Sequence, residues 1–220
     1  MEKVMVFAPH PDDDLIGCGG SMAHHVRKGD PVSIVYMTSG EAGSIDSQPD
    51  ALAACREDEA IRAAACMQIE DLVFLRFPDG GLEYRPKHLD NLVSIIRTRQ
   101  PNRIYLPHSG DAVSDHEATH RLVMEAIRRA AGPWHPQCGP TPWHVDTILG
   151  YEVWTPLHTI GSVQDITPYI SLKLQALRIH HSQVESLHYD QAIAGLNRYR
   201  GIMTGQGDYC ECFQLIRARL

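Results

Sequence analysis

One histidine and three aspartates follow the first apolar run of the chain, in the segment Ala8-Pro-His-Pro-Asp-Asp-Asp14. His10 and Asp13 are three residues apart, so a tight turn leading into a helix would direct both side chains to one point and leave Asp12 facing elsewhere. An imidazole and a carboxylate suit Zn²⁺ or a similar divalent ion, and a catalytic site then needs a third protein ligand and a position for water. The alternative is that the aspartates only cap the helix, but three consecutive carboxylates exceed what capping requires.

A second group of histidines and acids lies between His108 and His120. It follows an expected strand, which puts it at the same sheet edge as the first group and makes His116 the natural third ligand, with Asp115 near enough to act on a neighbouring group. His116-Glu-Ala-Thr-His120 also matches H-E-x-x-H, which in zinc proteases uses both histidines as ligands and the glutamate, here Glu117, as general base. That alternative needs a further ligand downstream, and no obvious second helix follows, so we expect metal binding not to depend on His120.

Short apolar runs alternate with longer amphipathic ones along most of the chain. This alternation predicts an α/β fold with a Rossmann-like, mostly parallel sheet flanked by helices, and we expect residues 1–220 to form a single domain. In such sheets ligands bind where the loops at the carboxyl ends of the strands meet. The expected strands cover residues 4–8, 32–38, 72–77, 104–106, 147–154 and 213–216, and the expected helices cover 15–28, 51–68, 87–99, 115–131, 172–186 and 190–203.

Charge and hydropathy narrow the function classes. Acidic residues outnumber basic ones by 27 to 20, and the resulting net charge of -7 argues against a nucleic-acid partner. No stretch approaches the roughly 18 apolar residues of a membrane span, and the first apolar run is too short for a signal peptide, so we expect a soluble, cytoplasmic protein. Gly17-Cys-Gly-Gly20 is a weak dinucleotide-binding pattern, but the carboxylates before it would repel a pyrophosphate, and close helix packing explains these glycines better. The sequence leaves open whether the protein forms a homo-oligomer.

Taken together, these motifs resemble the PIG-L/LmbE family of zinc-dependent N-acetylglucosamine deacetylases. The first segment is similar to the family signature A-H-P-D-D-E, and the likeness continues through most of the chain, in Thr38-Ser-Gly-Glu41, Arg56-x-x-Glu59, Phe77-Pro-Asp79-Gly, Asp115-His116, Lys173-x-x-Ala-Leu and Ser182-Gln183. The resemblance implies an amino-sugar substrate and a Zn²⁺ ion, with Fe²⁺ open as an alternative. It also implies roles for particular residues: zinc ligands His10, Asp13 and His116, general base Asp12, histidine-orienting Asp115, and sugar-binding Arg56 and Asp79.

By this resemblance we expect an enzyme that removes the acetyl group of an N-acetylglucosamine-type substrate by amide hydrolysis with a metal-activated water. One position departs from the family, because its usual H-P-D-H signature is Val113-Ser-Asp-His116 here. The missing histidine would stabilise the oxyanion or protonate the leaving amine, and valine can do neither. The candidate replacements are His181, which we rank first, then His108, and also His120. The alternative function is a metal-dependent carbohydrate-binding protein that has lost turnover.

Several of these residues also have purely structural explanations. Arg56 and Glu59 have the spacing of an ion pair on a helix surface. Asp79 stands before a glycine, as a turn residue does. His180-His181, on an amphipathic helix, would be one packed and one solvated residue. The sequence leaves each of these alternatives open.

Overall fold

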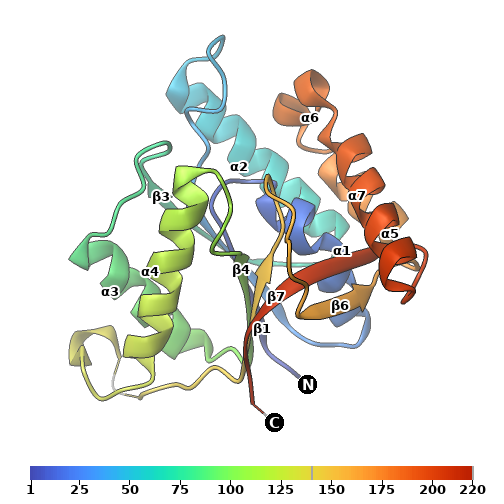
Figure 1. The fold of residues 1–220 in the computed structure, drawn as a ribbon. Coiled ribbons are helices and arrows are strands. Elements are labelled where there is room, and N and C mark those ends of the chain that lie inside the picture. Colours follow the sequence, from blue (N-terminus) through green and yellow to red (C-terminus); the bar gives the residue numbers. More distant parts are fainter. Residues whose placement is uncertain (140, 220) are drawn as a thin grey trace.

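One mixed β-sheet carries every strand in the part of the chain that the computed structural model describes, residues 1–139 and 141–219 (Figure 1). The strand order is β3-β2-β1-β4-β5-β7-β6. The first five strands in this order are parallel, whereas β7 pairs antiparallel with both β5 and β6. The predicted mostly parallel α/β fold is therefore confirmed. The strands are β1 (Val4–Ala8), β2 (Val32–Thr38), β3 (Asp71–Phe77), β4 (Arg103–Pro107), β5 (Thr147–Tyr151), β6 (Ser162–Asp165) and β7 (Cys210–Ala218).

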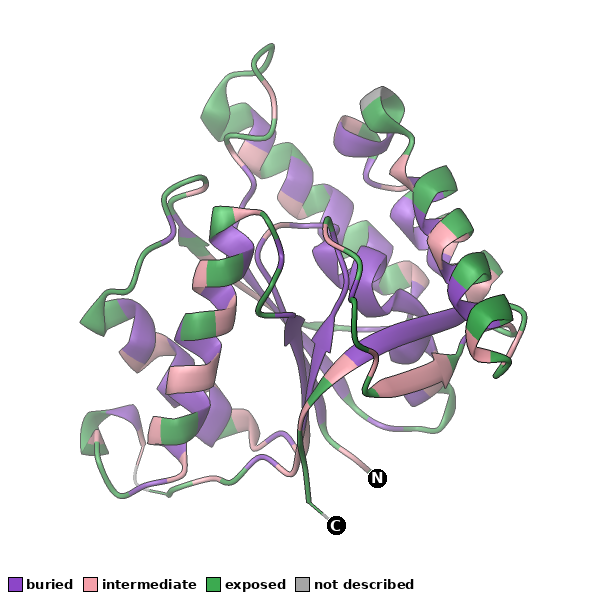
Figure 2. Cartoon of the chain, viewed as in Figure 1, coloured by how far each residue is buried: buried purple, intermediate pink, exposed green. Residues whose placement is uncertain are grey.

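Helices cover both faces of this sheet and bury its strands between two layers (Figure 2). Val4 and Val6 of β1 belong to one apolar core, and Met5 and Phe7 belong to the other, because successive side chains of a strand point to opposite faces. Burial on both faces explains why the central strands are continuous apolar runs. No helix in the described ranges is long and apolar enough to cross a membrane. One layer consists of α3 (Pro86–Arg99) and α4 (Ser114–Ala130), and the other contains α1 (Asp13–Arg27), α2 (Pro49–Cys66), α5 (Ile170–Leu177), α6 (His181–Leu187) and α7 (Tyr189–Thr204).

Two differences from the predicted elements lie in the last third of the chain. The single helix predicted over residues 172–186 is two helices, α5 and α6, that are separated near His180. The break is stabilised by a tertiary contact, because the Glu59 carboxylate on α2 accepts hydrogen bonds from the backbone N–H and the hydroxyl of Ser182 (2.9 and 2.6 Å). Strand β6 was not predicted, since Ser162–Asp165 has no apolar run and pairs only with β7.

Helix α1, which begins at Asp13, is interrupted at Cys18, whose backbone angles are not helical (φ -144°, ψ 23°). The interruption frees backbone N–H groups that a continuous helix would satisfy internally. The Glu211 carboxylate on β7 accepts hydrogen bonds from two of them, at Gly20 and Ser21 (both 2.8 Å), and forms a fully buried ion pair with Lys173 (2.7 Å). The last strand therefore fixes the direction of the first helix.

The glycines of α1 serve close packing. A Cβ atom at Gly17 would overlap the ring of Tyr151, and one at Gly20 would overlap the Ile166 side chain. The ring of Tyr151 is fully buried, and its hydroxyl donates a hydrogen bond to the carbonyl oxygen of Phe7 (2.8 Å). Packing of the helix against the sheet thus explains these glycines, as expected.

Candidate metal and substrate site

The two predicted clusters meet at the carboxyl edge of the sheet, between the neighbouring strands β1 and β4. Helix α1 follows β1 on one face of the sheet, and α4 follows β4 on the other face (Figure 1). The two connecting loops therefore diverge and leave a crevice, which is the usual ligand site of an open parallel sheet. The first loop carries His10 and Asp12, and the second leads to His116 in the first turn of α4.

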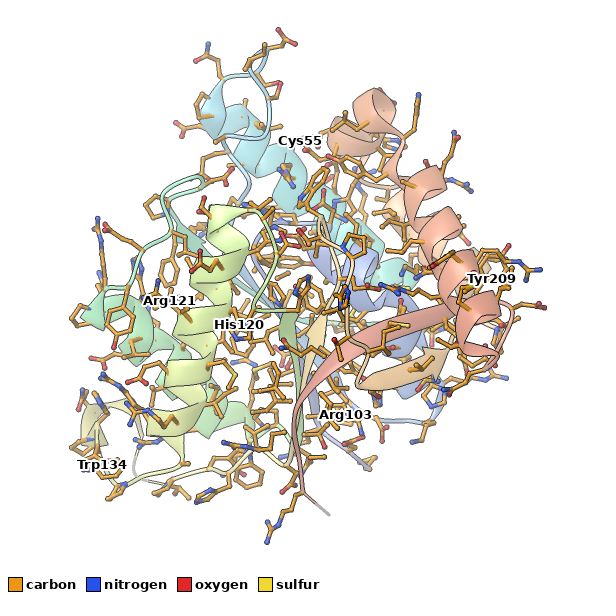
Figure 3. All side chains as sticks on the ribbon, viewed as in Figure 1. Cys55, Arg103, His120, Arg121, Trp134 and Tyr209 are labelled. Carbon is orange, nitrogen blue, oxygen red and sulfur yellow. The ribbon has the colours of Figure 1, made fainter. Side chains whose placement is uncertain are left out.

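His10, Asp13 and His116 form a compact set of metal-type donor atoms. The Oδ2 atom of Asp13 lies 3.1 Å from Nδ1 of His10 and 3.3 Å from Nε2 of His116. One donor atom from each residue lies within 4.8 Å of the other two. His120, one turn further along α4, is directed elsewhere, because its Nδ1 donates a hydrogen bond to the carbonyl oxygen of Pro107 (2.8 Å; Figure 3). The fold thus brings together the three predicted ligands and leaves out the second histidine of the H-E-x-x-H match.

Each of the two histidines has carboxylates on the side of its ring away from Asp13. Nδ1 of His116 lies 3.3 Å from Oδ1 of Asp111. Nε2 of His10 lies 3.0 Å from Oδ1 of Asp79 and 3.4 Å from Oδ2 of Asp115. Metal-binding histidines commonly direct their second nitrogen to such a carboxylate, which fixes the tautomer and the ring orientation. The arrangement around both rings therefore fits a metal site.

Asp111 is a candidate site residue to which the sequence interpretation assigned no role. The sequence signal was its position five residues before His116, inside a cluster that was already suspected. Asp79 was predicted to bind a sugar; it does line the pocket, but its Oδ2 accepts a hydrogen bond from the Ala42 N–H (2.7 Å) while its Oδ1 faces His10. Oδ2 of Asp115 lies 3.4 Å from Nε2 of His10, and its predicted role of orienting a histidine stays a prediction.

The electrostatics of the cluster fit a bound cation. Burial by itself would lower the pKa values of His10 and His116, but the surrounding carboxylates raise both, that of His116 to about 9. Burial opposes the ionised form of Asp13, yet the two imidazoles hold its pKa below the usual range. Both ring nitrogens of His116 are buried without a well-formed hydrogen bond to the described residues, although a carboxylate oxygen lies 3.3 Å from each. A divalent ion would supply the positive charge and the missing partner, so the donor set fits a metal.

The three consecutive aspartates have three different environments, and capping is not the role of the first. Asp12 occupies the N-cap position of α1 but makes no side-chain capping hydrogen bond, and its φ of 124° is in a region that side-chain-bearing residues rarely adopt. Asp13 faces the histidines. Asp14 accepts a hydrogen bond from the buried Tyr36 hydroxyl (3.2 Å). The alternative that these residues merely cap the helix is wrong for Asp12, whose backbone is held in a strained conformation at the site.

Asp12 is paired with a buried arginine. Its Oδ2 lies 3.3 Å from Nη2 of Arg56, and that guanidinium also donates hydrogen bonds to two backbone carbonyl oxygens. Arg56 does not form the surface ion pair with Glu59 that the sequence left open, since Arg56 is 4% exposed and Glu59 binds Ser182. Burial raises the pKa of Asp12 to about 7, although Arg56 counteracts this shift. Such a carboxyl group can exchange a proton near neutral pH.

The crevice forms a pocket of about 380 Å³ above these groups. Val113 lies on its wall, at the position where the family signature has histidine. The two highest-ranked replacement residues lie outside the lining. His108 donates from Nε2 to the carbonyl oxygen of Thr155 (2.7 Å), and the side chain of His181 is 61% exposed. The pocket is lined by His10, Asp12, Asp13, Ile16, Ala42, Gly43, Arg56, Asp79, Gly80, Val113, Ser114, Asp115, Trp154, Gln183 and Tyr189.

His180 is the packed member of the His180-His181 pair, as the structural alternative proposed. Its side chain is fully buried, and burial lowers its pKa to about 3, so the ring is neutral. Neither ring nitrogen has a hydrogen-bond partner among the described residues. His180 is not part of the pocket wall.

Fold and site together define an α/β protein with a metal-type donor cluster at the floor of a sheet-edge pocket. The family model "PIG-L: GlcNAc-PI de-N-acetylase" matches residues 5–127, and the chain belongs to this family. The probable N-acetyl-alpha-D-glucosaminyl L-malate deacetylase 2 of Bacillus subtilis is 30% identical over 84% of this chain and 85% of its own.

Two solved structures have the same fold over nearly the whole chain. A conserved protein of Thermus thermophilus is 29% identical, with a TM-score of 0.89 over 100% of this chain and 97% of its own. The N,N'-diacetylchitobiose deacetylase of Pyrococcus horikoshii is 27% identical, with a TM-score of 0.88 over 98% of this chain and 84% of its own. The expected family is therefore confirmed.

Proposed function

We propose that this protein is a metal-dependent N-deacetylase that hydrolyses the acetamide of an N-acetylglucosamine-type substrate. The observation that carries the proposal is the donor set of His10, Asp13 and His116, of which His10 and Asp13 line the pocket together with the carboxyl group of Asp12. The deacetylases among the similar proteins support the same reaction. The protease alternative lacks support, because His120 is bonded away from the cluster.

His10, Asp13 and His116 would hold the ion, which we propose to be Zn²⁺. When bound, such an ion polarises an amide carbonyl and lowers the pKa of a coordinated water toward ~7. Asp12 accepts the proton of the attacking water. Arg56 keeps the Asp12 carboxylate in place and favours its ionised form, which is the form that accepts a proton.

The proton must then reach the leaving amine. Val113 cannot supply it, and neither His108 nor His181 lines the pocket. We therefore assign this step to Asp12 as well: the carboxyl group that takes the proton from water returns it to the nitrogen as the C–N bond breaks, which yields acetate and a free amine. The same carboxyl group thus acts first as general base and then as general acid.

Acetate release tests this function directly. Metal-free protein, the same protein reloaded with Zn²⁺, and a reloaded Asp12→Asn variant are assayed with N-acetylglucosamine conjugates. We expect activity only after reloading and a kcat lower by about 10²-fold or more in Asp12→Asn, at unchanged metal content. Metal-loaded wild-type protein that binds the sugars but releases no acetate would instead indicate a carbohydrate-binding protein.

A further inference from the structure

A second set of metal-type donor atoms lies at the opposite end of α4 from the candidate site, where the loop that follows this helix meets α3 (Figure 1). The set consists of Asp90 on α3 and of His135 and Cys138 in the loop, and one donor atom from each residue lies within 4.8 Å of the other two. Helix α4 has 17 residues and at about 1.5 Å per residue spans roughly 25 Å, so the two sets are separate.

The backbone of this loop is held in place by a buried arginine on α3. Arg97 follows Asp90 by about two helical turns and therefore lies on the same face of the helix. Its guanidinium donates hydrogen bonds to the carbonyl oxygens of His135 and Gly139 (2.7 and 2.8 Å) and to those of other loop residues. His135 has a left-handed backbone conformation (φ 58°, ψ 58°), which residues with a side chain rarely adopt. The donor atoms are thus presented by a preorganised backbone.

The three side chains of the set already contact one another. Nδ1 of His135 lies 3.2 Å from Oδ1 of Asp90, and the thiol of Cys138 donates a hydrogen bond to the same carboxylate. Burial and the neighbouring Asp90 raise the pKa of the Cys138 thiol, so it keeps its proton until a cation replaces that proton. The side chains of Asp90 and His135 are partly exposed, which gives an ion access from solvent.

The chemistry of the set favours Zn²⁺. Thiolate and imidazole are common zinc ligands, whereas Mg²⁺ and Ca²⁺ prefer oxygen ligands alone. One thiolate and one carboxylate would balance the two charges of the ion. Gln137 reaches the same centre, because its amide nitrogen lies 3.3 Å from Oδ2 of Asp90 and 3.4 Å from Nδ1 of His135. A half-turn of this amide would present its oxygen there as a fourth donor.

Binding of an ion would change one existing contact. Nη1 of Arg129 lies 3.0 Å from Nε2 of His135 and can only donate to it, so the proton of the neutral ring is on Nδ1. A metal on Nδ1 requires that proton on Nε2, where it would face Arg129. A small shift of the guanidinium removes the conflict, because Arg129 is partly exposed and its other nitrogens are hydrogen-bonded to Glu125 and Tyr84 (2.7 and 3.0 Å).

We propose that Asp90, His135 and Cys138 form a second Zn²⁺ site, which connects the loop after α4 to α3. On binding, the thiol proton leaves to solvent and the imidazole proton moves from Nδ1 to Nε2. Bonds then form from the ion to sulfur, to Nδ1 and to a carboxylate oxygen. This site is structural and does not depend on the proposed deacetylase function.

Titration with Co²⁺ distinguishes the two sites, because a thiolate bound to cobalt gives a charge-transfer band in the near ultraviolet. The donor set of His10, Asp13 and His116 contains no sulfur. Metal-free, reduced protein should develop the band on addition of Co²⁺, in wild type and in His10→Ala, and Cys138→Ser should lose it. Cys55→Ser is the matched control: Cys55 is an exposed residue of α2 outside the donor set, so this variant should keep the band.

Asp90→Asn guards against misfolding of Cys138→Ser, since it changes a partly exposed side chain and retains the buried thiol. It should raise the Co²⁺ concentration at half-saturation of the band roughly tenfold or more, because loss of outer partners alone costs about 10- to 100-fold. Zinc analysis after gel filtration should find one more ion per chain in wild type than in Cys138→Ser. The absence of the band in wild type, an unchanged band in Cys138→Ser, or equal zinc contents would overturn the inference.

Discussion

Replacement of Asp111 by asparagine tests whether the carboxylate behind His116 helps to bind the metal. The Asp111 side chain is fully buried, with one oxygen 3.3 Å from Nδ1 of His116 and the other accepting the N–H groups of Trp154 and Thr155. Each of these groups faces the Asp111 carboxylate with a nitrogen that donates a proton. In Asp111→Asn the side-chain NH₂ group, itself a donor, would therefore face another donor in either orientation of the amide. Loss of such an outer partner lowers metal affinity by about 10- to 100-fold, or about 1.4 to 2.7 kcal/mol.

The loss of metal affinity should depend on how many carboxylates face each histidine. His10 has two, so Asp79→Asn and Asp115→Asn should each weaken metal binding less than Asp111→Asn does. The assay is competition for Zn²⁺ against a chromophoric chelator, with thermal unfolding of the metal-free variants as the control for folding. The opposite ranking, with Asp111→Asn within twofold of wild type, would refute the reasoning and place the ion on the other side of His10, between Asp79 and Asp115.

Three further predictions concern other parts of the molecule. His10→Ala should lose the zinc of the candidate site whereas His120→Ala should retain it, as metal analysis after gel filtration will show; the reverse result would restore the protease-like assignment. Val113→His adds a proton donor to the pocket and should therefore raise kcat. The pH profile of kcat should gain a new limb on the basic side, and unchanged kinetics would mean that the side chain at position 113 does not face the reacting group. Glu211→Gln leaves Lys173 buried without its counterion and should cost about 3 kcal/mol or more in urea unfolding. The control Asp58→Asn removes the exposed ion pair with Arg62 and should cost less than about 1 kcal/mol; equal losses would contradict the role of the buried pair.

The donor cluster could be predicted from sequence because its residues follow parallel strands, whose carboxyl ends lie at the same edge of a sheet. His10 and Asp13 are close in sequence, and His116 comes from the neighbouring strand's loop, so topology alone brings them to one edge. The outer partners could not be predicted in the same way. The pairing of each carboxylate with a histidine ring depends on the directions of side chains in loops. Acidic residues are also common near metal-binding motifs, so the sequence does not show which of them faces which histidine.

The histidine ranking shows where pattern reasoning fails. The sequence ranks His181 first because the family resemblance places the adjacent Ser182-Gln183 near the site, and a group that arrives from across the pocket could face both the metal and the leaving nitrogen. The actual break, stabilised by Glu59, buries His180 and turns His181 to solvent. A contact between α2 and α6 that spans more than a hundred residues carries no local signal in hydrophobic periodicity. The same applies to β6, a short edge strand without a period of its own.

The interruption of α1 also determines when the second half of this helix can be fixed in place. The amides of Gly20 and Ser21 find their acceptor 190 or 191 residues later in the chain, on β7. At a synthesis rate of 5–20 residues per second, Glu211 is added about 10 to 40 s after Ser21. Until then the second half of α1 has no partner for these groups, although β1 and the loop with Asp13 have long been available. Because such distant contacts form slowly, the second half of α1 can be fixed in place only after the last strand has been made and has docked.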